Sequence, residues 1–337
     1  MKKIISSFII LAITLTVSCF SFKTISKAEN YNEDIISKET IAFDEKNYEE
    51  LSNDKIYEEK IKKLNISPSF SKIIELQMYD DICNAKEIIL ENSYYIGMDD
   101  GTMIQTTEEN YLSQVKNNKK VINEMDQYMR NKLSNGISLL TVIGSPGNTK
   151  KINGGTLNLG VILITNDGKN YSCGCIFDWE TMPNARYKDA IGLTRDGTTS
   201  VVPQSACGTV IYSYNYRYMD GTNYVSEKKE ETKETSFNQL KASSSGYAFD
   251  FQMGVNSSDQ NYPYRSVYYT NMVGSIYYKG MVNNSSIKSV NHWATYAHKK
   301  IGIISSSIDF SIPFNAGFKV SVGFVYSQLV DEHLWRL

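Results

Sequence analysis

Two carboxylates, an aromatic ring and a guanidinium lie close together near position 180. Asp178, Trp179 and Glu180 follow a strand-like run, and Arg186 comes shortly after them. Two carboxylates can act as the acid and base of glycoside hydrolysis when their separation is fixed. Nothing in the sequence fixes that separation. We therefore expect this cluster on a loop, either as a ligand-binding loop or as a capped turn packed on a sheet.

Tyrosines alternate with other residues further along the chain. In a β-strand, alternate side chains share one face, and here these side chains are Tyr212, Tyr214, Tyr216 and Tyr218. Such a face can serve as an aromatic platform for a sugar or another flat ligand. It is equally typical of a half-buried sheet surface, since Tyr favours strands and its hydroxyl reaches the rim. The 24 tyrosines of the chain favour the half-buried surface.

Four cysteines follow the N-terminal segment, at positions 83, 173, 175 and 207. Cys173 and Cys175 alternate within a strand-like run, so their side chains should share a face. An exported protein permits disulfides. We predict a bridge from Cys207 to Cys173 or Cys175, with four free thiols as the alternative.

Cys207 also lies in a small-residue run, Gln204 to Gly208, that resembles the surroundings of some catalytic cysteines. A cysteine nucleophile needs a histidine base to lower its pKa, and His292 or His298 would have to supply it. These two histidines would share a strand face and could begin a zinc site, but no third ligand is in reach by sequence. We predict no metal and no cofactor, and a secreted hydrolase remains a second alternative function.

Apolar and polar residues alternate on both sides of residues 315–317, which predicts a β-hairpin over 307–328. A β-barrel pore inserts hairpins of this kind into lipid. Each membrane-spanning strand needs about 9–11 residues, whereas the first strand here is short and contains Pro313. An ordinary sandwich hairpin is favoured, and a pore-forming toxin is the first alternative function.

The first 28 residues have the pattern of a bacterial secretory signal. Two lysines precede an apolar run at 4–20, and residues 26–28 offer small side chains in the A-x-A pattern. We predict export, with cleavage after Ala28. A retained membrane anchor is one alternative, because the run is near the lower limit for spanning a bilayer. A lipoprotein acylated at Cys19 is the other.

Charge is unevenly distributed along the chain. Residues 29–135 carry 22 acidic and 13 basic residues, a net of −9, whereas 136–337 carry 15 and 18, a net of +3. Neither part is basic enough to indicate binding of nucleic acid. The acidic part is a candidate pro-segment that docks on the rest. The expected partner is an extracellular glycan, cell wall or protein, with membrane contact as the alternative.

The order of patterns predicts an α+β fold. Residues 29–65 are polar and should be partly disordered or loosely helical, and 66–136 should be helical, with a helix start at Pro68 and a long helix over 107–134. Residues 137–337 read as about ten strands separated by Gly, Asn and Asp turns, which predicts a mostly antiparallel β-sandwich. We expect a non-enzymatic extracellular binding or interaction protein, acting at a cell surface or on an extracellular ligand.

Overall fold

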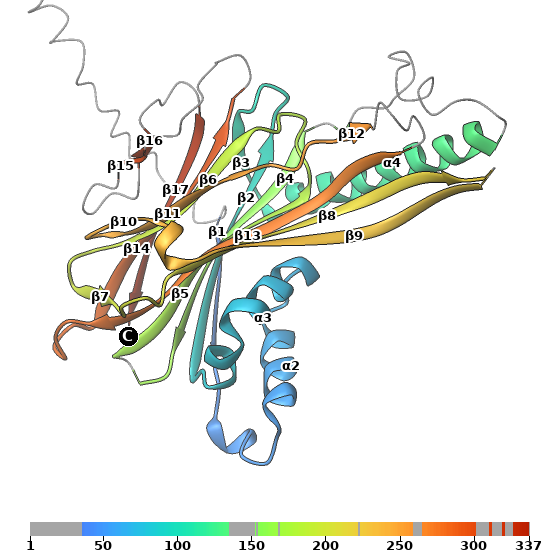
Figure 1. Ribbon diagram of the computed structural model, residues 1–337. Helices are drawn as coiled ribbons and strands as arrows, with labels where there is room; N and C mark the ends of the chain where they lie inside the picture. Colours follow the sequence, from blue (N-terminus) through green and yellow to red (C-terminus); the bar gives the residue numbers. More distant parts are fainter. Residues whose placement is uncertain are drawn as a thin grey trace, which may run out of the picture. The chain divides into compact units, whose positions relative to one another are not determined.

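The computed structural model describes residues 36–134, 152, 154–167, 169–221, 223–258, 265–300, 310–311, 319–320 and 326–336. The predicted signal peptide and Cys19 lie outside these residues. Every strand pairing in the described part is antiparallel, and most strands belong to two sheets (Figure 1). The prediction of a mostly antiparallel, two-sheet protein is therefore confirmed.

The larger sheet has ten strands. Its main path runs β1 (Ile36–Ala42), β2 (Glu87–Gly97), β4 (Gly155–Thr165), β5 (Asn170–Thr181), β13 (Ser266–Val282), β8 (Cys207–Asp220) and β9 (Asn223–Thr235). Three short strands extend it: β3 (Met103–Thr106) on β2, and β7 (Thr199–Val201) and β12 (Ser257–Ser258) on β13. The predicted hairpins β4–β5 and β8–β9 are both present. Gly221 has a φ of +60° at the β8–β9 turn, a conformation that favours glycine.

The smaller sheet has five strands, in the order β10 (Lys241–Ser243), β11 (Gly246–Gln252), β6 (Lys188–Arg195), β14 (Ser289–Lys299) and β17 (Tyr326–Arg336). A 3₁₀ turn at Phe237–Gln239 precedes β10. Alternate side chains of both sheets meet in one apolar core, which includes Phe177 and Trp179 from the larger sheet and Tyr296 and Trp335 from the smaller one. This is the core of a β-sandwich.

Helices α2 (Asn53–Lys63) and α3 (Pro68–Cys83) pack on the other face of the larger sheet (Figure 1), after a 3₁₀ turn at Glu45–Asn47. Helix α3 begins as predicted: Pro68 is its first residue, and the Ser67 hydroxyl accepts a 3.1 Å hydrogen bond from the Phe70 N–H. Phe70, Ile73 and other fully buried side chains of α3 form a second core with apolar side chains of β4 and β5. The sheet thus has a core on each face.

Helix α4 (Glu108–Ser134) confirms the predicted long helix and covers the same sheet face as α3. Its Tyr111 and Val115 pack against Tyr94 of β2. The Asn118 amide, 2% exposed, donates to the Gly154 carbonyl at 2.8 Å and to the Thr181 hydroxyl at 2.9 Å. In Figure 1, α4 runs alongside the far ends of β8, β9 and β13.

The predicted separation of an acidic leader and a helical region from a β domain needs correction. Residues 36–42 form the edge strand β1, and 87–97 form β2, which lies inside the sheet between β1 and β4. Ile88, Ile89 and Leu90 are all buried because both faces of the sheet are covered there, and such an apolar run resembles a buried helix segment in sequence. Residues 137–337 alone would lack β1, β2, β3, α2, α3 and α4.

Most of the predicted hairpin at 307–328 lies outside the described residues. Its described parts are β15 (Phe310–Ser311) and β16 (Lys319–Val320), which pair antiparallel with each other, and the start of β17. The pore-forming alternative therefore stays a prediction. Among the helices of the described residues, none combines the length and the apolar character needed to cross a membrane.

Candidate binding site beneath helix α4

The predicted cluster around position 180 lies within strand β5 and not on a loop. Because successive side chains of a strand point to opposite faces, the cluster is divided. Trp179 is fully buried in the sandwich core, where its indole N–H donates a 2.7 Å hydrogen bond to the Tyr296 hydroxyl. Asp178 and Glu180 instead face helices α3 and α4.

Arg186 lies away from both carboxylates, between β5 and β6. Its Nε donates to the Pro183 carbonyl at 2.7 Å, and its Nη1 donates to Asn256 Oδ1 at 2.7 Å. The guanidinium therefore fastens its own loop to the segment after β11. It does not join Asp178 and Glu180 in one site.

The four predicted tyrosines share one face of β8, as expected, but this face is on the sandwich side of the sheet. Tyr212 is 3% exposed, and its hydroxyl donates to the Gln252 carbonyl at 2.8 Å. The Tyr214 ring packs on Tyr269, with 5.3 Å between centroids. The sheet thus separates Tyr212 and Tyr214 from Asp178, so the tyrosines and the carboxylates do not form one ligand-binding surface.

Charged side chains of the neighbouring strand β9 contact three of these tyrosines. The Lys229 and Lys233 ammonium groups lie 4.6 and 4.9 Å from the ring centroids of Tyr216 and Tyr212. The Tyr218 hydroxyl donates to Glu227 at 2.7 Å. This arrangement matches a half-buried sheet surface.

The predicted disulfide is not formed, and all four described cysteines are free. Cys173 and Cys175 share the sandwich core, as predicted, whereas Cys207 packs on the helix side. Strand β13 lies between β5 and β8, so the strands of these cysteines are about 9.5 Å apart. That separation exceeds the reach of a disulfide.

The predicted pairing of Cys207 with a histidine base is absent as well. His292, His298 and His333, the three histidines of the chain, lie in the smaller sheet, with the sandwich core between them and the helix face. Burial, with a contribution from Glu234, raises the pKa of the Cys207 thiol, which disfavours a thiolate. The described residues contain no group of three or more side chains suited to hold a metal ion.

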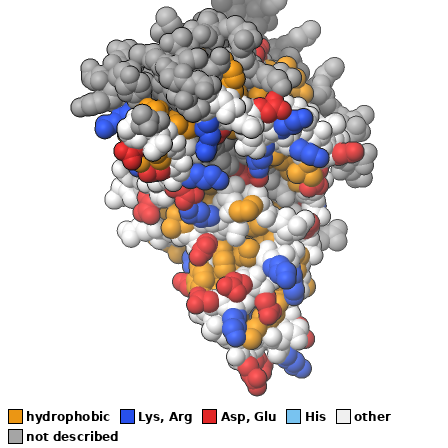
Figure 2. Space-filling view, turned by 90° about the vertical axis from the view of Figure 1, so that its right-hand side faces the viewer, with side chains coloured by type: hydrophobic (Ala, Val, Ile, Leu, Met, Phe, Trp, Pro, Cys, Tyr) orange, Lys and Arg blue, Asp and Glu red, His pale blue; other side chains and the backbone are white. Residues whose placement is uncertain are grey.

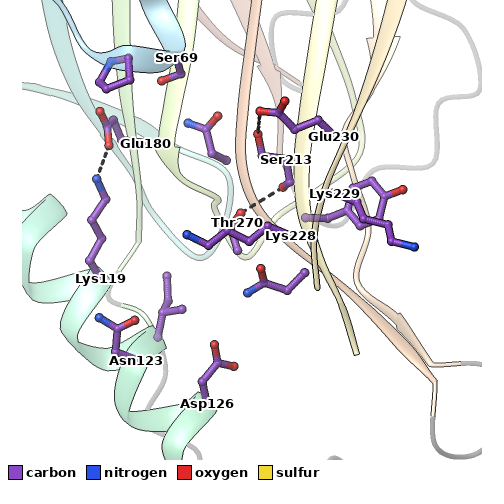
Figure 3. A pocket seen from close by; sticks show the side chains of 15 residues that line it. Ser69, Lys119, Asn123, Asp126, Glu180, Ser213, Lys228, Lys229, Glu230 and Thr270 are labelled. Atoms are coloured by element: carbon purple, nitrogen blue, oxygen red, sulfur yellow. Dashed lines mark hydrogen bonds and ion pairs between the residues drawn. The ribbon is translucent and has the colours of Figure 1, made fainter. Parts of the chain in front are cut away.

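A cavity of about 740 Å³ lies between α4, the start of α3 and the helix face of β5, β8, β9 and β13 (Figure 3). Sites for small molecules in proteins typically measure about 300–1,000 Å³. Most residues of the lining have polar or charged side chains. Apart from Tyr214, whose ring packs on Tyr269, the uncharged hydrogen-bonding side chains of the lining are Ser69, Asn123, Ser213, Asn215, Thr270 and Asn271.

The charged side chains that face the cavity are Lys119 and Lys228, with Asp126, Glu180 and Glu230; Lys229 belongs to the wall, but its side chain lies over Tyr216 on the other face of β9. Lys119 Nζ on α4 and Glu180 Oε2 on β5 form an ion pair at 2.6 Å at one edge of the cavity (Figure 3). Asp126, further along α4, pairs with Arg217 of β8. Two ion pairs at the border of the cavity thus attach helix α4 to the sheet.

Asp178 lies behind the cavity wall and organises it. It is 1% exposed; its Oδ2 accepts 2.7 Å hydrogen bonds from the hydroxyls of Ser67 and Ser69, and its Oδ1 accepts from the Asn271 amide at 2.8 Å. Burial, and secondly the charge of Glu180, raise the pKa of the Asp178 carboxyl to about 6. Asp178 therefore positions Ser69 and Asn271, which line the cavity.

The sequence alone pointed to Asp178 and Glu180 but not to the rest of the cavity. Asn123, Asn215 and Lys228 are ordinary surface residue types without a motif. Their convergence depends on where α4 crosses the sheet, and the only sequence signal for it is the alternation of polar residues in β8 and β9.

Comparison with known proteins assigns no family: no family model matches this chain, and no curated protein sequence matches it. Solved structures with partial likeness include the collagen-binding domain of a Staphylococcus aureus adhesin, at 10% identity and a TM-score of 0.22 over 41% of this chain and 81% of that one. A pore-forming protein has 9% identity and a TM-score of 0.22, over 56% and 88% of the two chains. A collagen-binding domain of the Erysipelothrix rhusiopathiae surface protein RspB has 8% identity and a TM-score of 0.21, over 54% and 65%. With TM-scores this low, none of these likenesses transfers a function to this chain.

Proposed function

We propose that this chain is a non-enzymatic extracellular binding protein that holds a glycan in the cavity beneath α4. The observation that carries this proposal is the composition of the lining, in which six side chains are amides or hydroxyls. These groups both donate and accept hydrogen bonds, as sugar hydroxyls do. Pro68 and Ile122 are the aliphatic residues of the lining.

The arrangement of the carboxyl groups favours binding over hydrolysis. A general acid must be within hydrogen-bond reach of the group that it protonates. Asp178, the carboxyl with the raised pKa, is buried behind Ser69 and Asn271 and is not part of the lining. Glu180 reaches the cavity but is paired with Lys119.

The charge of the surface argues against a polyanionic ligand. In the part of the face that the structure describes in Figure 2, Lys and Arg side chains lie among Asp and Glu side chains, without a large patch of one sign. The cavity itself is lined by residues of both signs. The secretory pattern of residues 1–28 supports an extracellular location for this binding.

Calorimetric titration of soluble oligosaccharides tests the proposal. Asn123 is exposed on α4 and lines the cavity, so Asn123→Trp should fill the site without disturbing a core. We expect this variant to lose glycan binding. The matched control is Asn117→Trp, an exposed residue of the same helix outside the lining, which should bind as the parent does. Equal binding by both variants, or no binding by the parent, would overturn the proposal.

A further inference from the structure

We propose that the cavity recognises a carboxylate-bearing glycan, such as one that contains a hexuronic acid, through Lys228 and Asn215. This inference rests on the proposed function and narrows its ligand class. The carboxylate would be bound by the Lys228 ammonium and the Asn215 side-chain amide together.

The two residues are placed side by side by the β8–β9 hairpin. Asn215 and Lys228 are register partners on these strands, so their Cβ atoms are about 5 Å apart and their side chains share a face. That face is the one toward α4, because Ser213 and Asn215 line the cavity. In Figure 3, the Lys228 side chain extends from β9 into the space that faces Lys119 and Asn123.

Lys228 differs from the neighbouring lysines in its lack of a partner. Lys119 pairs with Glu180, Lys229 with Glu227 at 3.2 Å, and Lys233 with Glu231 at 3.4 Å. Within the described part of the chain, Lys228 has neither an ion pair nor a hydrogen bond. It is therefore a cation at the cavity that is available to an anionic group.

Asn215 supplies the second, independent observation. It is only 8% exposed, yet its side-chain amide has no hydrogen-bond partner among the described residues. Polar side chains with this little exposure are normally hydrogen-bonded in folded proteins. A ligand oxygen at the cavity floor would satisfy the amide NH₂.

The ligand chemistry follows from these two groups and their surroundings. An ammonium and an amide donor match the two oxygens of a carboxylate, in hydrogen bonds that the charge strengthens. Asp126, Glu180 and Glu230 also line the cavity and would repel a ligand with many negative charges. The amide and hydroxyl lining is suited to the sugar hydroxyls around a single bound carboxylate.

A disaccharide with a single hexuronic acid residue and the methyl ester of that disaccharide are the probes, because they differ by one charge and little in shape. We expect the parent protein to bind the acid about 10- to 100-fold more tightly than the ester, as a charge-assisted contact predicts. Lys228→Gln should abolish this preference, because it should lower the affinity for the acid and leave the affinity for the ester unchanged. Lys228→Arg should keep the preference. Lys233→Gln, the same change on the same strand outside the cavity, is the control and should leave both affinities unchanged.

Asn215→Leu provides a second variant, which should also lower the affinity for the acid more than the affinity for the ester. One set of results would overturn this inference while the proposed function stands. The parent would bind acid and ester equally well, Lys228→Gln would bind both as the parent does, and Asn123→Trp would bind neither. Absence of binding of either probe, together with absence of binding of any neutral oligosaccharide, would overturn the proposed function itself. The two failures are thus distinguishable.

Discussion

The Asp178 carboxylate on β5 accepts a 2.7 Å hydrogen bond from the Ser69 hydroxyl in the first turn of α3. The same oxygen also accepts from Ser67, the residue that caps the helix, so one carboxylate holds the start of α3 against the sheet. Burial and the nearby Glu180 raise the pKa of this carboxyl to about 6. The contact between Asp178 and the start of α3 therefore responds to pH in a range where surface carboxylates do not titrate.

Replacing Asp178 should change how stability depends on pH. The pKa of Asp178 rises from 3.8 to about 6 on folding, so its stabilising contribution is present below pH 3.8 and is lost as pH rises through 6. Relative to Asp178→Asn, the free energy of unfolding of the parent should fall by about 3 kcal/mol between pH 4 and pH 7.5. Urea denaturation of both proteins across this range measures the difference.

Asp44→Asn is the control for this experiment, because Asp44 is exposed. Its unfolding free energy should differ from that of the parent by a constant amount at all pH values. A constant difference for Asp178→Asn as well would show that Asp178 does not titrate near pH 6.

The predictable parts of this fold are those governed by local patterns. Helix α4 has apolar residues at helical spacing, and the β4–β5 and β8–β9 hairpins have turn residues between alternating strands, so each was predictable from its own segment. Strand β2 was not, because Ile88 to Leu90 are apolar in succession. An apolar run is ambiguous when both faces of the strand are covered, as they are here by α3 and the smaller sheet.

The candidate site was predictable only in part, for a related reason. The alternation rule could have placed Asp178 and Glu180 on one face and Trp179 on the other, had residues 178–180 been assigned to the strand instead of a loop. Which element covers the carboxylates depends on pairing between distant segments, such as β13 beside both β5 and β8. The alternation of polar residues in β8 and β9 does not show which element covers them, so Asn215 and Lys228 could not be identified in advance.

His292 should make the protein sensitive to acid. Its ring is fully buried in β14, and burial, followed by the charges of His333 and Arg195, lowers its pKa to about 3. Its contribution to stability is present above pH 6.5 and is lost as pH falls, because only the unfolded chain accepts the proton readily. Between pH 7 and pH 4 this contribution falls by about 3 kcal/mol.

The variant His292→Gln should therefore lose less unfolding free energy than the parent over that interval, in guanidinium titrations at each pH. Tyr171→Phe is the control, since it removes only the hydroxyl 3.1 Å from His292 Nε2 and leaves the titrating ring in place. Its pH dependence should match that of the parent. If His292→Gln were as sensitive to acid as the parent, His292 would not be the source of this loss of stability.

Two glycines test how closely α3 packs on the sheet. A Cβ atom at Gly160 would lie 2.5 Å from the Phe70 ring, which is fully buried and cannot move aside. At Gly174 the Cβ would meet the terminal methyl of Met78, which is flexible. We expect Gly160→Ala to lower the free energy of unfolding by about 1–3 kcal/mol, and Gly174→Ala to lower it less. Thermal and urea denaturation would rank the two, and the reverse order would show that α3 shifts as a unit.

The ion pair between Arg217 and Asp126 should be a strongly coupled link between β8 and α4. The Arg217 side chain is 8% exposed, and its guanidinium also lies 4.7 Å from the centroid of the Tyr268 ring. Asp126→Asn leaves a nearly buried cation without its counter-charge, which should destabilise the fold by about 3 kcal/mol. Adding Arg217→Met removes that cation, so the double variant should be more stable than the sum of the two single losses predicts. A double-mutant cycle in urea should give a coupling of about 1–3 kcal/mol; strictly additive losses would mean that the pair does not hold α4 to the sheet.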